Sequence, residues 1–430
     1  MNVKFCVVVV ALVSVTMYSC KKEPDPQVSI SFTNNFNLNQ WVVLSDQNGT
    51  VLSWKSLPYG SPTSLSFPLK DDSINVTIIE QNGSGSSMYT NLTTYTNVVQ
   101  GNYGKAPNDG PLVQTAKGTF KLINPDPTSF AGFNVSSDCG WTQNANGTRY
   151  LVDVCDKSSL YVAISLQSSS VYRYLYIPQI KAGDSVVVDK AFFNTLPLMQ
   201  ANNISLGEDA YGTTILTGTT TTTRQNFLAT FWEPGYLQQP LPLYYPGQVG
   251  TLFDNYQALV FYNRVSNPSI EFVYQIQTTT PATLTFQEFQ GDITAVNSKT
   301  TTNLSYNLSG SAHFITTSFA VPRTASGSQG SWTVHSKFAT TVQTNLPKFP
   351  EDLKKAVDLG VISNLDVSEI TLTKTSDGGY KSFYTNTILS DAQPSYAAHK
   401  IFLPNAKGSF GSRTMAKKSL AKIMGQNFQH

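Results

Sequence analysis

The sequence has little charge, few cysteines and few histidines. Charged residues make up 13% of the 430 residues, and the formal net charge is +2 at pH 7. A chain with so weak a field does not attract polyanions, so we expect no nucleic-acid partner. The four histidines are widely spaced along the chain. Because a zinc site needs converging ligands, we expect no metal and no cofactor.

Several motifs of catalysis are also missing. The sequence contains no Gly-x-Ser-x-Gly, no His-Glu-x-x-His, no phosphate-binding loop and no Asp-rich calcium loop. These absences argue against the hydrolases and the nucleotide- or calcium-binding proteins that depend on such motifs. We therefore expect a non-enzymatic protein with no catalytic residues of these classes.

Long apolar runs are missing after the N-terminus. The run Phe5 to Met17 follows the basic residue Lys4. It is too short to cross ~30 Å of hydrocarbon as a helix, which takes about 20 residues, but it matches the apolar core of a secretory signal. Residues 1–19 are therefore predicted to be a signal peptide.

A lipid anchor is predicted at Cys20. The small residue Ser19 precedes it, and the polar, proline-broken stretch 21–26 follows. These residues resemble the site of lipoprotein signal peptidase, and the N-terminus resembles Bacteroidota-type exported lipoproteins, although Met17 and Tyr18 depart from the commonest residues. The resemblance implies acyl chains on Cys20, an anchor in the outer membrane on either its periplasmic or its cell-surface side, and a spacer over residues 20–27. The alternative is an ordinary secretory signal with an incidental cysteine.

One disulfide is predicted. Of the four cysteines, Cys6 leaves with the signal and Cys20 carries lipid, so Cys139 and Cys155 remain. An even remainder in an oxidising compartment indicates a bridge between them. Two separately buried thiols are the alternative.

Composition and periodicity predict a mostly β protein. Thr, Ser, Asn and Tyr are abundant and aromatic residues reach 12%, which favours strands. Period-two alternation begins at Val28, and Asn48-Gly49 supplies a hairpin turn between two apolar runs. Residues 28–125 and 133–225 are predicted to be two β-sandwich modules. Both resemble the immunoglobulin-like or carboxypeptidase-regulatory-like sandwiches of surface lipoproteins.

The rest of the chain is predicted to be a β-rich C-terminal domain, residues 231–410, with one or two short helices. One helix should begin after Pro350, and a hairpin should turn at Asp377-Gly378-Gly379. The basic tail, residues 411–430, predicts an amphipathic helix over 413–424 that lies on the protein body or on a membrane. Its apolar side comprises Ala416, Leu420, Ile423 and Met424, with Lys417, Lys418 and Lys422 elsewhere.

Two groups of residues are candidates for ligand binding. Tyr172, Tyr174 and Tyr176 alternate and so share one face of a strand, where their rings suit a sugar or a peptide, or else cross-strand packing. Trp232 and Glu233 lie in an aromatic, proline-rich loop. Glu233 would suit a glycosidase acid, although no partner carboxylate can be named, and a loop acid at a turn is the alternative.

Two serines are candidates for O-glycosylation. Asp72-Ser73-Ile74 and Asp184-Ser185-Val186 resemble the Asp-Ser/Thr-apolar acceptor motif of Bacteroidota. Both also suit ordinary turns at the start of strands.

Together these features predict a lipid-anchored cell-envelope protein that acts in binding or in envelope architecture. Its partners would be the membrane, through Cys20, and a glycan or an envelope protein. The alternatives are a carbohydrate-active hydrolase that uses Glu233 and an adhesin or pilus-like subunit.

Overall fold

The computed structural model describes most of the chain between residues 27 and 402. The described residues are 27–34, 38–68, 73–83, 88–104, 116–137, 139, 142–145, 148–155, 158–167, 171–206, 209–219, 226–231, 240–247, 252–301, 303–322, 329–359, 362, 365, 367–376, 379–389 and 396–402. They form six sheets and three short α-helices, so the predicted mostly β fold is confirmed.

One sheet of twelve strands runs through the molecule. Its order is β17 (Asn226–Phe231), β16 (Ala210–Thr219), β19 (Asn255–Arg264), β20 (Asn267–Thr278), β27 (Tyr396–Phe402), β26 (Val367–Thr375), β23 (Phe314–Val321), β24 (Gln329–Lys337), β6 (Tyr89–Val98), β5 (Ile74–Asn82), β2 (Asn39–Ser45) and β3 (Val51–Leu57). Strands from both ends of the chain thus belong to one sheet.

The N-terminal sandwich covers one end of this long sheet. Its second layer contains β1 (Gln27–Thr33), β4 (Pro62–Pro68) and β7 (Asn102–Tyr103). Ile30 and Phe32 of β1 are buried while Ser29 is exposed, which confirms the predicted alternation. The predicted hairpin between β2 and β3 is also confirmed, and Gly49 at its turn has φ +80°, a conformation that glycine adopts without strain.

The second sandwich has two layers. One contains β8 (Thr119–Ile123), β10 (Thr142–Ala145), β11 (Arg149–Asp153) and β14 (Ser185–Val187), and the other contains β9 (Phe130–Ser137), β12 (Ser158–Leu166) and β13 (Tyr172–Ile180). Helix α2 (Lys190–Thr195) closes the core with the buried Phe193. The helix begins at Asp189, whose side chain accepts a hydrogen bond from the Phe192 amide at 2.7 Å, the usual stabilisation of a helix start.

Two smaller sheets and a short helix pack on one face of the long sheet. The sheets pair β15 (Met199–Ile204) with β18 (Leu241–Pro246), and β22 (Asn303–Ser309) with β21 (Asp292–Thr300) and β25 (Thr341–Thr344). A 3₁₀ turn, η2 (Pro281–Thr283), lies between β20 and β21. Helix α3 (Glu351–Ala356) begins after Pro350 as predicted, and Leu353 enters the same core.

The predicted hairpin at Asp377-Gly378-Gly379 is wrong. Gly379, with φ +100°, leads into helix α4 (Tyr380–Thr387) instead of a strand. Turn residues such as Asp and Gly begin both kinds of element, so the local pattern could not distinguish them. Among the described residues, the C-terminal range 231–410 thus has two short α-helices, α3 and α4, in agreement with the one or two expected there.

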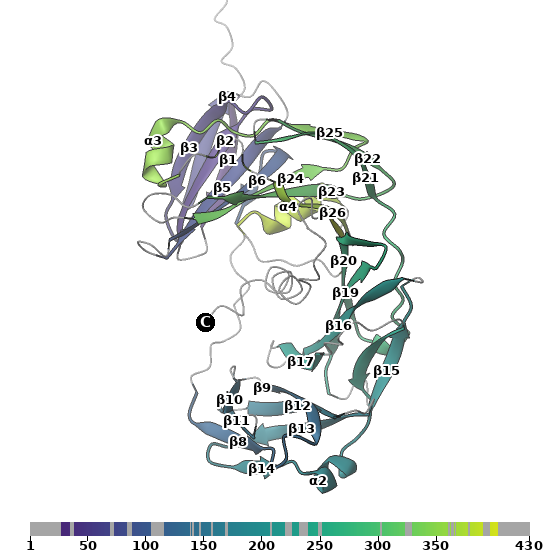
Figure 1. Ribbon diagram of the computed structural model, residues 1–430. Coiled ribbons are helices and arrows are strands. Elements are labelled where there is room, and N and C mark those ends of the chain that lie inside the picture. Colours follow the sequence, from purple (N-terminus) through teal and green to yellow (C-terminus); the bar gives the residue numbers. More distant parts are fainter. Residues whose placement is uncertain are drawn as a thin grey trace, which may run out of the picture.

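Strands from the C-terminal part of the chain lie beside the N-terminal strands. Figure 1 shows the N-terminal sandwich and the second sandwich at opposite ends of a curved body, with β16, β19 and β20 between them, and β21 to β26 lying again beside the N-terminal strands. Strands from the ranges 28–125 and 231–410 thus form one sheet, and β8, from the first range, pairs with β11 and β14 of the second sandwich. The predicted division of the chain into consecutive modules did not include these strand pairings between the modules.

The two parts of the long sheet meet where β6 pairs with β24 in parallel, Tyr89 to Tyr95 against Gln329 to His335. We call this ladder the seam. The Trp332 indole N–H donates to Thr94 Oγ1 at 2.9 Å across it. Gly330 lies so close to β6 that a Cβ atom there would be 1.7 Å from the Thr90 carbonyl oxygen. The seam therefore requires glycine at position 330.

Gly330→Ala should destabilise the protein. The added methyl group would push β24 away from β6, and we expect the free energy of unfolding to fall by about 1–3 kcal/mol. Urea denaturation measures this change. Gly132→Ala is the matched control in another strand, where the new Cβ would meet Ser165 Oγ at an ordinary 3.5 Å; it should change stability by no more than about 1 kcal/mol. Equal stability of the two variants would contradict the role given to the seam.

Candidate functional site

The three alternating tyrosines of β13 lie where the second sandwich meets the long sheet. Tyr174 is buried, and its ring stacks on that of Tyr161 with 6.0 Å between centroids. Tyr172 is half-buried, with its ring centroid 4.0 Å from that of Tyr244 on β18. Tyr176 is also half-buried and packs against the same core. The tyrosine face therefore packs against protein.

More rings extend this cluster toward the long sheet. Tyr161 contacts Phe253 edge-on at 5.5 Å, and Phe253 contacts Tyr256 at 5.7 Å. We call the group the aromatic junction; its members are Tyr161, Tyr172, Tyr174, Tyr176, Tyr244, Phe253 and Tyr256. Tyr244 was not among the predicted binding residues, although the aromatic stretch Tyr244-Tyr245-Pro246-Gly247 was the available signal in the sequence.

The opposite face of β13 is covered as well. Leu175 belongs to the core of the second sandwich and Ile177 packs against that core. The strand is therefore packed on both faces. What the junction offers to a ligand is its half-buried rim of Tyr172, Tyr176 and Tyr244, where flat rings can stack on a sugar or a peptide group.

The hydroxyl groups of Tyr161, Tyr174 and Tyr244 stay protonated at physiological pH. Burial raises the pKa of Tyr161 well above its usual value, and it also raises the pKa values of Tyr174 and Tyr244. The Tyr161 hydroxyl is fully buried and has no hydrogen-bond partner within the described residues. Such neutral phenols can donate hydrogen bonds but do not supply a base.

The other candidate residues of this region lie outside the described residues. These are Trp232 and Glu233, which follow directly on the last residue of β17, Phe231. Phe231 pairs with Ile215 of β16. The hydrolase hypothesis based on Glu233, like the lipidation of Cys20, thus stays a prediction.

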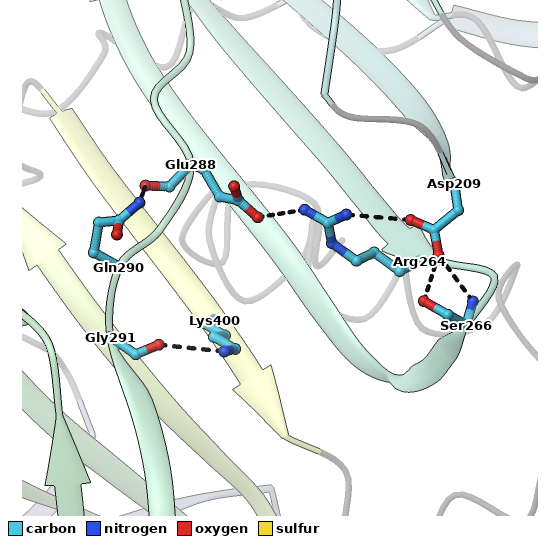
Figure 2. A network of polar contacts seen from close by, with 7 residues as sticks. All are labelled: Asp209, Arg264, Ser266, Glu288, Gln290, Gly291 and Lys400. Carbon is cyan, nitrogen blue, oxygen red and sulfur yellow. Dashed lines mark hydrogen bonds and ion pairs between the residues drawn. The ribbon is translucent and has the colours of Figure 1, made fainter.

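A network of charges holds the segment between β20 and β21 against the sheet. Figure 2 shows Arg264, at the end of β19, between the carboxylates of Asp209 and Glu288. Arg264 Nη1 lies 3.2 Å from Asp209 Oδ1, and Asp209 also accepts hydrogen bonds from the hydroxyl and the amide of Ser266. The hydrogen bonds from Ser266, followed by Arg264, lower the pKa of Asp209. The carboxylate therefore stays ionised and bound to Arg264.

Lys400 of β27 makes a second attachment to the same segment. Its Nζ atom donates to the Gly291 carbonyl oxygen at 3.3 Å, as drawn in Figure 2, and lies 3.1 Å from Asp292 Oδ1. The ammonium group also lies 5.3 Å from the ring centroid of Phe402, a distance at which a cation is attracted to the ring face. Arg264 and Lys400 therefore act as structural residues.

The remaining predicted positions are in the sandwiches. Cys139 and Cys155 are joined by a disulfide, with 5.5 Å between their Cα atoms, a usual distance for such a bridge. Ser185 is exposed at the start of β14, whereas Ser73 is half-buried before β5. Ser185 is thus the more accessible of the two for a modifying enzyme, and O-glycosylation at either serine stays a prediction.

Within the described ranges, no group of three or more His, Cys, Asp or Glu side chains is placed to hold a metal ion. Among the helices described, none has the length and hydrophobicity needed to traverse a lipid bilayer. No protein-family model matches this chain, and a search of curated proteins finds no relative.

Tyr161→Phe should leave the protein as stable as before or more stable, by about 1 kcal/mol, because it removes a buried hydroxyl that lacks a partner. Tyr380→Phe is the matched comparison. The Tyr380 hydroxyl accepts from the Thr96 amide at 2.8 Å, and its one proton is shared between the carbonyl oxygens of His335 and Thr96 at 2.7 and 2.9 Å, so its loss should cost about 1–3 kcal/mol. Urea denaturation of both variants gives the comparison, and a larger loss in Tyr161→Phe than in Tyr380→Phe would contradict it.

Mature, lipidated protein made in an oxidising compartment should show no free thiol on denaturation, because Cys139 and Cys155 are bridged. Reduction should expose both thiols to alkylation. Cys155→Ser should lower stability by ~3 kcal/mol, since the bridge closes a loop with a sequence separation of 16. Two cysteines that alkylate without reductant, detected by mass spectrometry, would show the prediction to be wrong.

Proposed function

We propose that this protein is a lipid-anchored component of the cell envelope that acts in binding or in envelope architecture. The observation that carries the proposal is the N-terminal pattern of signal, Ser19, Cys20 and polar spacer. The first described strand, β1, begins at Gln27, the last residue of the predicted spacer. A folded β body at the end of a short tether suits an anchored envelope protein.

The arrangement of sheets favours architecture or protein binding. A single sheet of twelve strands connects two sandwiches at opposite ends of the body. Hydrogen-bonded strands resist stretching and bending better than modules on a linker, so the sheet can hold two surfaces at a fixed separation. The aromatic junction packs one of these sandwiches onto the sheet, which supports a structural use of the tyrosines.

The rim of the aromatic junction supports a second candidate function, which is contact with a glycan or a peptide. Tyr172 and Tyr244 are half-buried and lie in ring contact. Aromatic rings exposed in this way bind sugar faces through their flat, apolar surface. The rim would serve binding while the buried rings serve packing.

Cys20→Ser should abolish lipid attachment, because the thiol that would form the thioether is lost. In cells fed an alkyne fatty acid, the unchanged protein should be labelled and should partition into detergent, whereas the variant should be unlabelled and remain unprocessed at the lipoprotein cleavage site.

A chain that starts at Lys22 without a signal is the control for folding. It should give a folded body in solution, because this chain keeps every residue of the hydrophobic cores described from β1 onward. Unchanged labelling in Cys20→Ser would overturn the anchor, and with it the proposed location.

A further inference from the structure

Strand β14 is an exposed edge of the second sandwich. It is the last strand in the sheet order β10-β11-β8-β14, and among the described residues it pairs only with β8. Val187 is 48% exposed, and Ser185 is exposed as well. Figure 1 shows β14 at the end of the body opposite the N-terminal sandwich. The edge therefore lies at the far end of the body from β1, the strand that follows the predicted anchor in the chain.

The hydrogen bonds of β14 show which of its backbone groups are open. The Lys121 amide of β8 donates to the Asp184 carbonyl oxygen, just before β14, at 3.0 Å. The Val188 amide, just after β14, donates to the Ile123 carbonyl oxygen at 2.8 Å. Alternate residues of a strand bond to one neighbour in a parallel ladder, so residues 184, 186 and 188 face β8. Residues 185 and 187 therefore direct their N–H and C=O groups to the open side.

Three other edge strands carry features that discourage pairing with another chain. β3 carries the exposed Lys55, β4 begins and ends with proline, and β21 contains two bulges. Charges, prolines and bulges are usual protections of an edge strand. The sequence of β14, Ser-Val-Val, contains neither a charge nor a proline, and its register with β8 is regular. Only its shortness limits pairing, so a partner would add a short segment.

The side chains beside this edge define what an added strand should carry. On the outer face of the sheet, away from the core that contains Leu122, Ser185 pairs with Lys121 and Val187 pairs with Ile123. Lys121 is exposed, and it forms no ion pair within the described part of the chain. Because Ser185 is small, the lysine side chain can reach past it to the edge. The edge thus offers one cation and, one row away, one apolar side chain.

We propose that β14 binds an extended peptide segment of an envelope protein as an added strand. An acidic residue of that segment faces Ser185, and an apolar residue faces Val187. The Cα atom of the acidic residue lies two strand spacings, about 10 Å, from that of Lys121, a gap that lysine and glutamate side chains span together. Main-chain hydrogen bonds supply affinity and the side-chain contacts supply specificity. Asp153 also lies on this face, but on β11, two strands from β14.

Other occupants use these features less completely. A second copy that pairs through its own β14 brings only Ser and Val, so Lys121 gains no partner. A glycan lacks the repeating N–H and C=O groups that pair with those of residues 185 and 187. The proposal adds a partner to the protein-binding role proposed above, and only the envelope origin of that partner rests on that role.

Two labelled peptides test the proposal by fluorescence anisotropy. One is Thr-Val-Thr-Glu-Thr-Val-Thr, and the other has Lys in place of Glu. The full chain, produced with its own signal and purified in a nonionic detergent, also carries Ser185→Ala so that an O-glycan cannot cover the edge. The Glu peptide should bind at least about fivefold more tightly, because Lys121 attracts it and repels the Lys peptide. The comparison does not depend on lipid at Cys20, so its failure is distinct from failure of the anchor.

A charge reversal identifies the residue responsible. Lys121→Glu should reverse the order of the two peptides, so that the Lys peptide binds about fivefold more tightly. Lys190→Glu is the matched control, because it makes the same change of net charge at an exposed lysine of α2. This control should leave the order unchanged. An order that is the same in Lys121→Glu as in the parent chain, or that Lys190→Glu also reverses, would overturn the proposal.

Val187→Pro tests the backbone contact. Proline removes the outward N–H group at position 187, while the bonds of residues 186 and 188 to β8 remain, so both peptides should bind about fivefold more weakly. Val187→Thr keeps the N–H group and should lose less. If Val187→Pro lowers the yield of folded protein, the reversal in Lys121→Glu still decides. Binding of neither peptide contradicts the proposal, and dimers that Val187→Pro dissociates, measured by light scattering, would assign the edge to a second copy instead.

Discussion

The parallel ladder between β6 and β24 is the interaction on which the rest of the structure depends. It joins four N-terminal strands to eight strands from residues 210–402, and its cross-strand bonds connect residues as far as 240 positions apart. The second sandwich is formed by residues between these two strands in the chain. Closing so long a loop costs conformational entropy, so the seam needs side-chain bonds beyond its ladder. The Trp332 to Thr94 bond and the close approach at Gly330 provide this tight fit.

The seam also brings residues from the second half of the chain into the core of the N-terminal sandwich. Three strands cover one end of the long sheet, and helix α4 continues this cover beside them. Tyr380 of α4 binds the backbone of both β6 and β24 through one hydroxyl, so the helix is attached at the seam itself. The core beneath contains Phe32 from the start of the chain and Phe314 and Tyr384 from its second half. The N-terminal residues therefore form a complete core only after the last third of the chain is present, and folding must be strongly non-local.

Local features of the fold were predictable from sequence, whereas the long-range ones were not. The alternation in β1, the Asn48-Gly49 turn and the start of α3 after Pro350 depend on a few neighbouring residues and are confirmed. The pairing of β6 with β24 leaves no mark in either strand, because a buried strand shows the same apolar residues whichever neighbour it has. For the same reason Tyr172, Tyr174 and Tyr176 were correctly placed on one face, while the ring of Tyr244 beside them was missed.

The ionisable groups of the described residues are used mainly to hold segments in place. Arg264 is bound between two carboxylates, Lys400 is bound to Gly291 and Asp292, and the buried tyrosines stay protonated because burial raises their pKa values. Glu271 differs from them. Its carboxyl group is buried, and burial, followed by repulsion from Glu369, raises its pKa to about 7. The carboxylates of Asp209 and Asp292 thus lie beside cations, whereas the carboxyl group of Glu271 lies near another carboxylate, so the fold disfavours its charged form.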